Sequence, residues 1–92
     1  MNTGDIINSN LTNSGSVTGG KNTGGLIGRN EGTTITGSTL TNIGHVEGGE
    51  NTGGLIGVNS AEISESSLIN TIKASVTGDD NTGGIIGTTP VL

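Results

Sequence analysis

The sequence predicts an all-β protein: a parallel β-solenoid that we expect to be right-handed, with about three coils of 29–30 residues and three short strands in each coil. A repeat of that length predicts the coils, because stacked copies of one unit form a continuous core. Aliphatic residues that alternate with Thr, Ser and Asn predict the strands. The 19 glycines among 92 residues argue against helices, since each interior glycine costs a helix about 1 kcal/mol relative to alanine.

One heptad marks the repeat. The residues Asn-Thr-Gly-Gly-Leu-Ile-Gly stand at 22–28 and again at 51–57, and a copy with a single Leu-to-Ile exchange stands at 81–87. The first two copies are 29 residues apart and the last two are 30 residues apart. We therefore expect one solenoid domain over residues 1–92, with repeat units 1–28, 29–57 and 58–87 and a tail of 88–92.

Large aliphatic residues occupy equivalent places in the three units. We expect each set to stack into an internal ladder, with parallel strands about 4.8 Å apart. Asn22, Asn51 and Asn81, which open the heptads, are expected to form an Asn ladder at a corner. Glycine pairs between the strands predict corners with positive φ. The aliphatic sets are Ile6/Ile35/Ile63, Leu11/Leu40/Leu68, Val17/Val46/Val76, and the pairs Leu26–Ile27, Leu55–Ile56 and Ile85–Ile86.

Two alternatives stay open in the sequence. A meander of hairpins would also show alternation, but it favours Asn-Gly or Asp-Gly turns, and the chain has neither. The neighbours Leu26 and Ile27 point to opposite faces of an extended strand, so one of them could join its equivalents in an outward apolar stripe. A corner could instead turn both inward. A stripe would mark an interaction surface.

The composition argues against several classes of function. The formal charge is −5 with only three Lys or Arg, so the clustered cations that bind nucleic-acid phosphates are missing. No apolar run approaches the roughly 20 residues of a membrane-spanning helix. Without cysteine there is no thiolate metal ligand and no thiol nucleophile. We expect no enzyme activity, no cofactor, and no catalytic or metal site.

The residues that could take part in catalysis, His45, Glu62 and Glu65, are expected to be exposed to solvent. His45 is the only histidine and has no Cys or second His with which to share a metal, so we expect it to face outward from its strand. Glu62 and Glu65 could form the carboxylate pair of a glycoside hydrolase. Three coils without loop insertions are expected to leave no cleft for such a pair.

Two further patterns point to specific ligands. Asp79 and Asp80, with Asp5, Glu47 and Glu50, suggest calcium, but the nine-residue Gly-Asp repeat of calcium β-rolls is absent, so we expect a solvated corner. The threonine pairs 34/36 and 39/41 are similar to the threonine ranks of ice-binding solenoids. A flat array would have to repeat in every coil, and these pairs do not, so ice binding is a distant third hypothesis.

Segments 17–30 and 46–59 resemble the GLUG motif. The specific part is the Gly-Gly-Leu-Ile-Gly core, followed in the first segment by Asn30-Glu-Gly-Thr-Thr-Ile35, and the resemblance extends over nearly the whole chain. The GLUG motif is a short glycine-rich repeat that occurs in tandem in large bacterial cell-surface proteins, including adhesins and some immunoglobulin A peptidases. The resemblance implies an extracellular, stalk-like or adhesive role and carries over no catalytic residue. The family often places an aromatic in the strand after Ile35, where this chain has Leu40.

The main functional hypothesis is a non-enzymatic structural or adhesive segment of an extracellular microbial surface protein, a stiff rod that displays or mediates binding. The alternative is a self-assembling subunit of an extracellular filament that stacks end to end, since open solenoid edges template further pairing unless they are capped. Pro90 is expected to stop the last strand, but the apolar Val91 and Leu92 cap it poorly. The expected partners are other copies of the chain, end to end or side by side, or other segments of a larger surface protein.

Overall fold

The computed structural model describes residues 1–32, 34–71 and 73–89, and no helix occurs in this part of the chain. Its strands form five sheets, each of three parallel strands, with one strand from each of three successive coils. The strands are β1 (Ile6–Ile7), β2 (Asn10–Asn13), β3 (Val17–Thr18), β4 (Thr23–Gly24), β5 (Ile27–Asn30), β6 (Thr34–Thr36), β7 (Thr39–Asn42), β8 (Val46–Glu47), β9 (Thr52–Gly53), β10 (Ile56–Asn59), β11 (Glu62–Ser64), β12 (Ser67–Asn70), β13 (Val76–Thr77), β14 (Thr82–Gly83) and β15 (Ile86–Thr88).

Equivalent residues of successive coils pair in register, which confirms the predicted ladders and the parallel β-solenoid. All the strand pairs are parallel, so the hairpin meander is wrong. The paired aliphatic sets are Ile6/Ile35/Ile63, Leu11/Leu40/Leu68, Val17/Val46/Val76 and Ile27/Ile56/Ile86.

Each coil has five strands, where the sequence predicted three. The heptad contributes part of the difference, because Thr23–Gly24, which the sequence did not assign to a strand, pairs with Thr52–Gly53. Backbone N–H and C=O groups can pair whatever the side chain is. Thr23–Gly24 contains no large aliphatic side chain and is too short to show alternation, so periodicity missed it.

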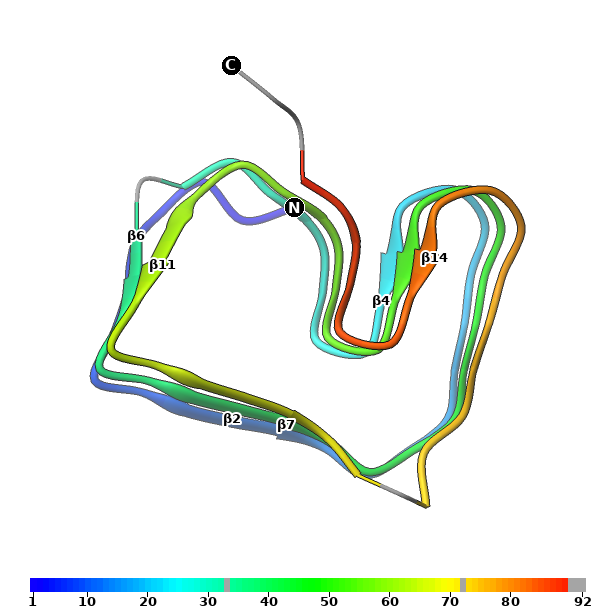
Figure 1. Cartoon of the computed structure of the whole chain (residues 1–92), viewed down its shortest axis with the longest axis horizontal. Helices are drawn as coiled ribbons and strands as arrows, with labels where there is room; N and C mark the ends of the chain where they lie inside the picture. Colours follow the sequence, from blue (N-terminus) through cyan, green and yellow to red (C-terminus); the bar gives the residue numbers. More distant parts are fainter. Residues whose placement is uncertain (33, 72, 90–92) are drawn as a thin grey trace.

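Each coil is a closed loop with a deep inward fold, seen along the stacking direction in Figure 1. β2 and β7 run along one side of the loop, and β6 and β11 close the side next to it. The chain enters the inward fold in β4, reverses, and leaves it in β5. The molecule measures 28 × 27 × 17 Å.

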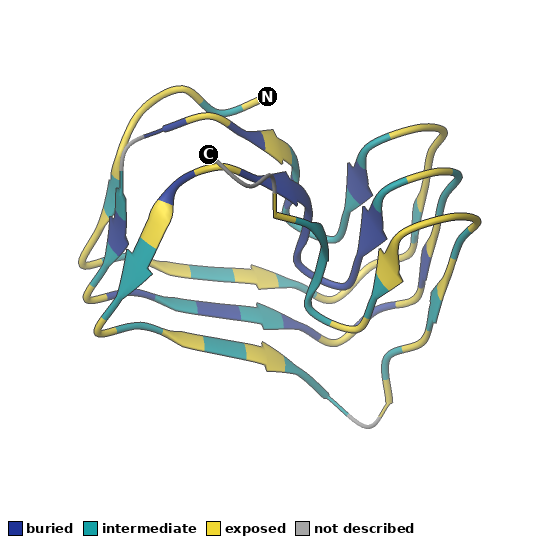
Figure 2. Cartoon of the chain, turned by 45° about the horizontal axis from the view of Figure 1, so that its top comes forward, coloured by how far each residue is buried: buried dark blue, intermediate teal, exposed yellow. Residues whose placement is uncertain are grey.

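The hydrophobic core is centred on the middle coil. Ile35, Leu40, Leu55 and Ile56 are each 0% exposed. Flanking aliphatics from the first and third coils pack against them and are only partly buried, as Figure 2 shows for the outer strands. The middle coil has a neighbour on both sides, whereas each outer coil has one.

The heptad turns both members of its aliphatic pair inward. Leu55 and Ile56 are equally buried, and Leu26, Ile85 and Ile86 pack against the same core. The chain reverses direction between β9 and β10, so these neighbours do not lie in one extended strand. The inward corner is therefore confirmed, and the outward apolar stripe is wrong.

The third unit absorbs its two extra residues between β12 and β13. The backbone N–H of Ala74 donates to the carbonyl oxygen of Thr71 at 3.0 Å and closes a turn. The ladder resumes at Val76, which pairs with Val46. Pro90, Val91 and Leu92, the predicted end of the last strand, lie outside the described residues.

Candidate functional site

The glycines of the heptad decide the shape of the inward fold. A Cβ on Gly24 would overlap the carbonyl oxygen of Ile27, on the opposite arm of the fold. A Cβ on Gly28 would lie 2.6 Å from the carbonyl oxygen of Asn22, on the first arm. The two arms meet backbone to backbone, at a separation that only glycine permits.

These glycines serve close approach, and not the positive φ that the sequence predicted for glycine corners. Among the described residues, Gly37 is the glycine with positive φ, at 61°. Non-glycine residues at positive φ include Asn22, Asn51 and Asn81, at 63°, 61° and 59°. Asn tolerates this left-handed conformation better than most residues, and it can therefore form a corner while keeping a side chain.

Threonine follows the corner asparagine and holds the first arm of the fold. Thr52 is 0% exposed, and its Oγ1 donates to the carbonyl oxygen of Gly49 at 2.7 Å. Thr23 and Thr82 make the equivalent bond, also at 2.7 Å. Glycine stands where the threonine needs room, since a Cβ on Gly48 would overlap Thr52 Oγ1.

The predicted Asn ladder at the corner is confirmed. Asn51 Nδ2 donates to Asn22 Oδ1 at 2.9 Å, and Asn81 Nδ2 donates to Asn51 Oδ1 at 3.0 Å. Each amide therefore bonds the equivalent amide of the preceding coil. The heptad thus fixes the spacing of neighbouring coils as well as its own turn.

Two further Asn ladders were missed in the sequence. Asn42 Nδ2 donates to Asn70 Oδ1 at 2.9 Å and also to the carbonyl oxygen of Gly44 at 3.0 Å, so one amide joins two coils and closes a corner. Asn30 and Asn42 are 0% exposed. The recurrence of Asn at equivalent places was the available signal, but it does not say which face the residue takes. The two ladders are Asn13/Asn42/Asn70 and Asn2/Asn30/Asn59.

His45 is exposed, as predicted. Its Nδ1 lies 2.6 Å from Ser75 Oγ, in the neighbouring coil. The described part of the chain contains no group of three or more His, Asp or Glu side chains that could hold a metal ion. No pocket is found over the same residues.

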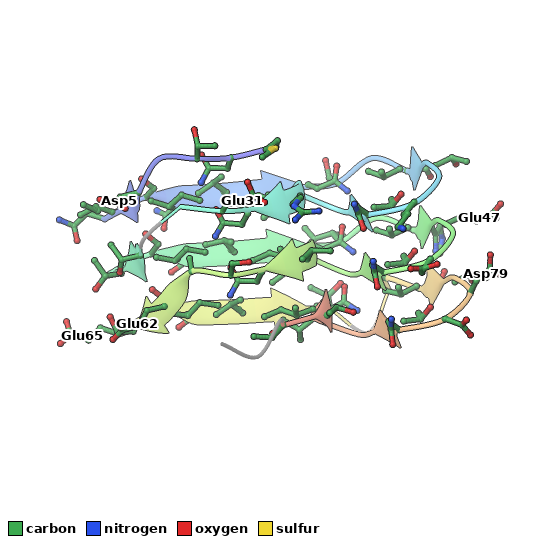
Figure 3. All side chains as sticks on the ribbon, turned by 90° about the horizontal axis from the view of Figure 1, so that it is seen from above. Asp5, Glu31, Glu47, Glu62, Glu65 and Asp79 are labelled. Carbon is green, nitrogen blue, oxygen red and sulfur yellow. The ribbon has the colours of Figure 1, made fainter. Side chains whose placement is uncertain are left out.

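Most of the labelled acidic residues lie toward the two ends of the molecule as viewed in Figure 3, and Glu31 lies between them. Figure 3 shows Asp5, Glu62 and Glu65 at one end and Glu47 and Asp79 at the other. The structure thus separates Asp5 from Glu47 and Asp79, and no three of the suggested calcium ligands form a metal-binding group among the described residues. Across the coils, Lys21 Nζ lies 3.6 Å from Glu50 Oε1, and both side chains are largely exposed. Such exposed pairs contribute little, about 0–1 kcal/mol.

The threonine pairs form no repeated array. Thr34 pairs with Glu62, and Thr36 pairs with Ile7 and Ser64. The residues beside Thr39 are Asn10 and Ser67, and those beside Thr41 are Thr12 and Ile69. None of these four positions is threonine in all three coils, so the flat threonine ranks that the ice-binding hypothesis needs do not form.

A comparison with known families finds a match to one part of the repeat. Residues 19–47 match the family model of the GLUG motif. This segment is similar to the GLUG motif. It is one coil in length, since it enters the inward fold in β4, continues through β5, β6 and β7, and ends with β8. The matched segment therefore contains both arms of the fold, the corner Asn22 and the buried Asn30 and Asn42.

Other comparisons add nothing to this identification. No curated protein and no solved structure matched the chain. None of the described residues forms a helix of the length and apolarity needed to cross a membrane.

Proposed function

We propose that this chain is a structural or adhesive repeat segment of an extracellular microbial surface protein, in which it serves as a stiff rod that displays or mediates binding. The observation that supports this role is the continuity of the ladders. Five sheets and three Asn ladders run through all three coils, and the GLUG motif supplies one full coil of them.

The ladders make the rod resist bending. To bend the stack, inter-coil hydrogen bonds must stretch along one side, and these bonds are distributed around the whole loop. Each bond contributes only about 0.5–1.5 kcal/mol. Because the coils are coupled to their neighbours, many such bonds must open together before a coil separates.

Antibodies raised against the purified chain test the location. Applied to intact cells of the source microbe, they should label the surface before permeabilisation. A cytoplasmic protein labelled on the same cells is the control for leakage. Labelling that requires permeabilisation contradicts the extracellular role.

The second candidate is a subunit of a self-assembling extracellular filament. The partial burial of the end ladders favours it, since Leu11 and Leu68 are only partly covered while Leu40 between them is 0% exposed. Sedimentation velocity and negative-stain microscopy of the purified chain separate the two candidates. Monomers at all concentrations exclude the filament, and rods much longer than 17 Å exclude a purely passive segment.

A further inference from the structure

We propose that the exposed face of the third coil binds the first coil of a second copy of this chain, in the same register that joins the coils within the chain. The proposal rests on the filament candidate above and specifies its interface. The partner is a second copy because the first and third coils present the two complementary sides of one repeated interface.

Gly84 is the strongest indication of a covering coil. A Cβ on Gly25 would overlap the carbonyl oxygen of Gly54, and a Cβ on Gly54 would overlap that of Gly84. A Cβ on Gly84 would meet nothing within 4 Å. Gly84 also lies outside the positive-φ region, so its backbone does not require glycine. Within the single chain nothing requires glycine at position 84, whereas a further coil would leave no room for a Cβ there. Stacking places Gly25 of the second copy over Gly84.

The hydrogen bonds of the Asn ladders run in directions that a stacked second copy can continue. Within the chain, Asn13 Nδ2 donates to Asn42 Oδ1 and Asn42 Nδ2 donates to Asn70 Oδ1. Continued stacking directs Asn70 toward Asn13 of the second copy. At the corner the direction is opposite, since Asn51 donates to Asn22, so the second copy's Asn22 would donate to Asn81. Both ladders continue with each donor facing an acceptor.

Stacking would bring together one pair of opposite charges and one pair of like charges. The backbone N–H of Asn22 bonds the carbonyl of Glu50, and that of Asn51 bonds the carbonyl of Asp80, so Lys21, Glu50 and Asp80 occupy one column. Stacking brings Lys21 of the second copy to Asp80, an attractive pair. It also brings Asp5 of the second copy to the column of Glu62, a repulsive pair.

The register also defines one overlap. Asn2 lies beside Asn30 in the first coil, and Thr88 lies beside Val58 in the third. In a stack, residues 1–2 of the second copy and residues 88–89 of the first share one layer. One of these two segments must move aside, and the ladders formed by the other strands are unaffected.

Gly84→Ala tests the interface. Its added methyl meets nothing in the single chain, so its circular dichroism and thermal unfolding should equal those of the wild type at low concentration. Sedimentation velocity should show concentration-dependent association of the wild type and loss of that association in Gly84→Ala. Mixed with wild type at a low ratio, Gly84→Ala should shorten the stacks, because it adds through its first coil and offers no site for the next copy.

Gly20→Ala is the matched control. Gly49, its equivalent in the middle coil, would carry a Cβ at 3.4 Å from the nearest atom of the preceding coil, which is ordinary van der Waals contact. Gly20→Ala should therefore associate like the wild type. Association of Gly84→Ala equal to that of the wild type overturns the interface while the filament candidate survives. A wild type that stays monomeric overturns both, and leaves the rod segment untouched.

Discussion

At the scale of single residues, glycine and asparagine have different tasks in this chain. Gly24 and Gly28 allow two backbone arms to touch, and Gly48 leaves room for Thr52. Asn22 takes the left-handed conformation of a corner, and its side-chain amide bonds the neighbouring coil, since Asn22 Oδ1 accepts from Asn51. A composition that resembles a flexible linker therefore encodes close packing, because many of these small or polar residues have a defined neighbour.

Gly53→Ala should unfold the protein or lower its free energy of unfolding by about 3 kcal/mol, the upper part of the range for an overpacked site. A Cβ at Gly53 would overlap the carbonyl oxygen of Ile56 and lie 2.8 Å from Gly87 N and Ile85 O, all of them backbone atoms. Urea denaturation followed by circular dichroism measures the effect. Gly84→Ala is the control in the third heptad, and equal stabilities for the two variants would show that the arms can separate.

Leu55→Asp should abolish cooperative folding. Leu55 is 0% exposed and is surrounded by aliphatic side chains. An unpaired buried carboxylate at this place costs several kcal/mol. His45→Ala, in the same coil, should change stability by less than about 0.5 kcal/mol because the side chain is exposed. Thermal melts compare the two. A cooperative Leu55→Asp variant with an unchanged spectrum contradicts the buried ladder.

At the scale of elements, the inward fold and the ladders depend on each other. β4 and β5 are the arms of the fold, and the next coil repeats them as β9 and β10. The buried asparagines hold the corners beside them, with Asn42 next to Gly25. The elements are thus too short to be stable singly, and each is stabilised mainly by its equivalent in the neighbouring coil.

Asn42→Ala should destabilise the chain by about 2–3 kcal/mol, since it removes a buried amide and leaves its buried and half-buried polar partners unsatisfied. Those partners include Asn13 Nδ2, Asn70 Oδ1 and the carbonyl oxygen of Gly44. Asn10→Ala, an exposed position on β2, is the matched control and should be nearly neutral. Chemical denaturation measures both, and a neutral Asn42→Ala would show that the internal ladder contributes no net stability.

At the scale of the whole molecule, stability is distributed along the stack and is greatest in the middle coil. Ile35, Leu40 and Leu55 are 0% exposed, and their equivalents in the outer coils are partly exposed. A coil with a neighbour on each side forms two ladder interfaces, and an end coil forms one. The incomplete burial of the end coils is also the basis of the filament candidate, because a coil of a second copy would bury the exposed ends of the ladders.

Amide hydrogen exchange should reveal this gradient. The N–H groups of Val46 and Leu55, which bond the third coil, should exchange more slowly than those of Val17 and Leu26, which bond the second coil from the partly covered first coil. Two-dimensional NMR after transfer to deuterated water measures the rates. Uniform rates along the stack would show that the coils open only together.

The sequence by itself determined the solenoid, its period and the register of its aliphatic ladders. Recurrence of Ile35, Leu40 and Val46 at fixed places is enough, because identical units bury their apolar faces by stacking. The tertiary structure decided the inward fold, the two-residue strands and the inward faces of Asn30 and Asn42. These features depend on how closely Gly24 lets one arm approach the other, a distance between backbones that no pattern of side chains along the chain records.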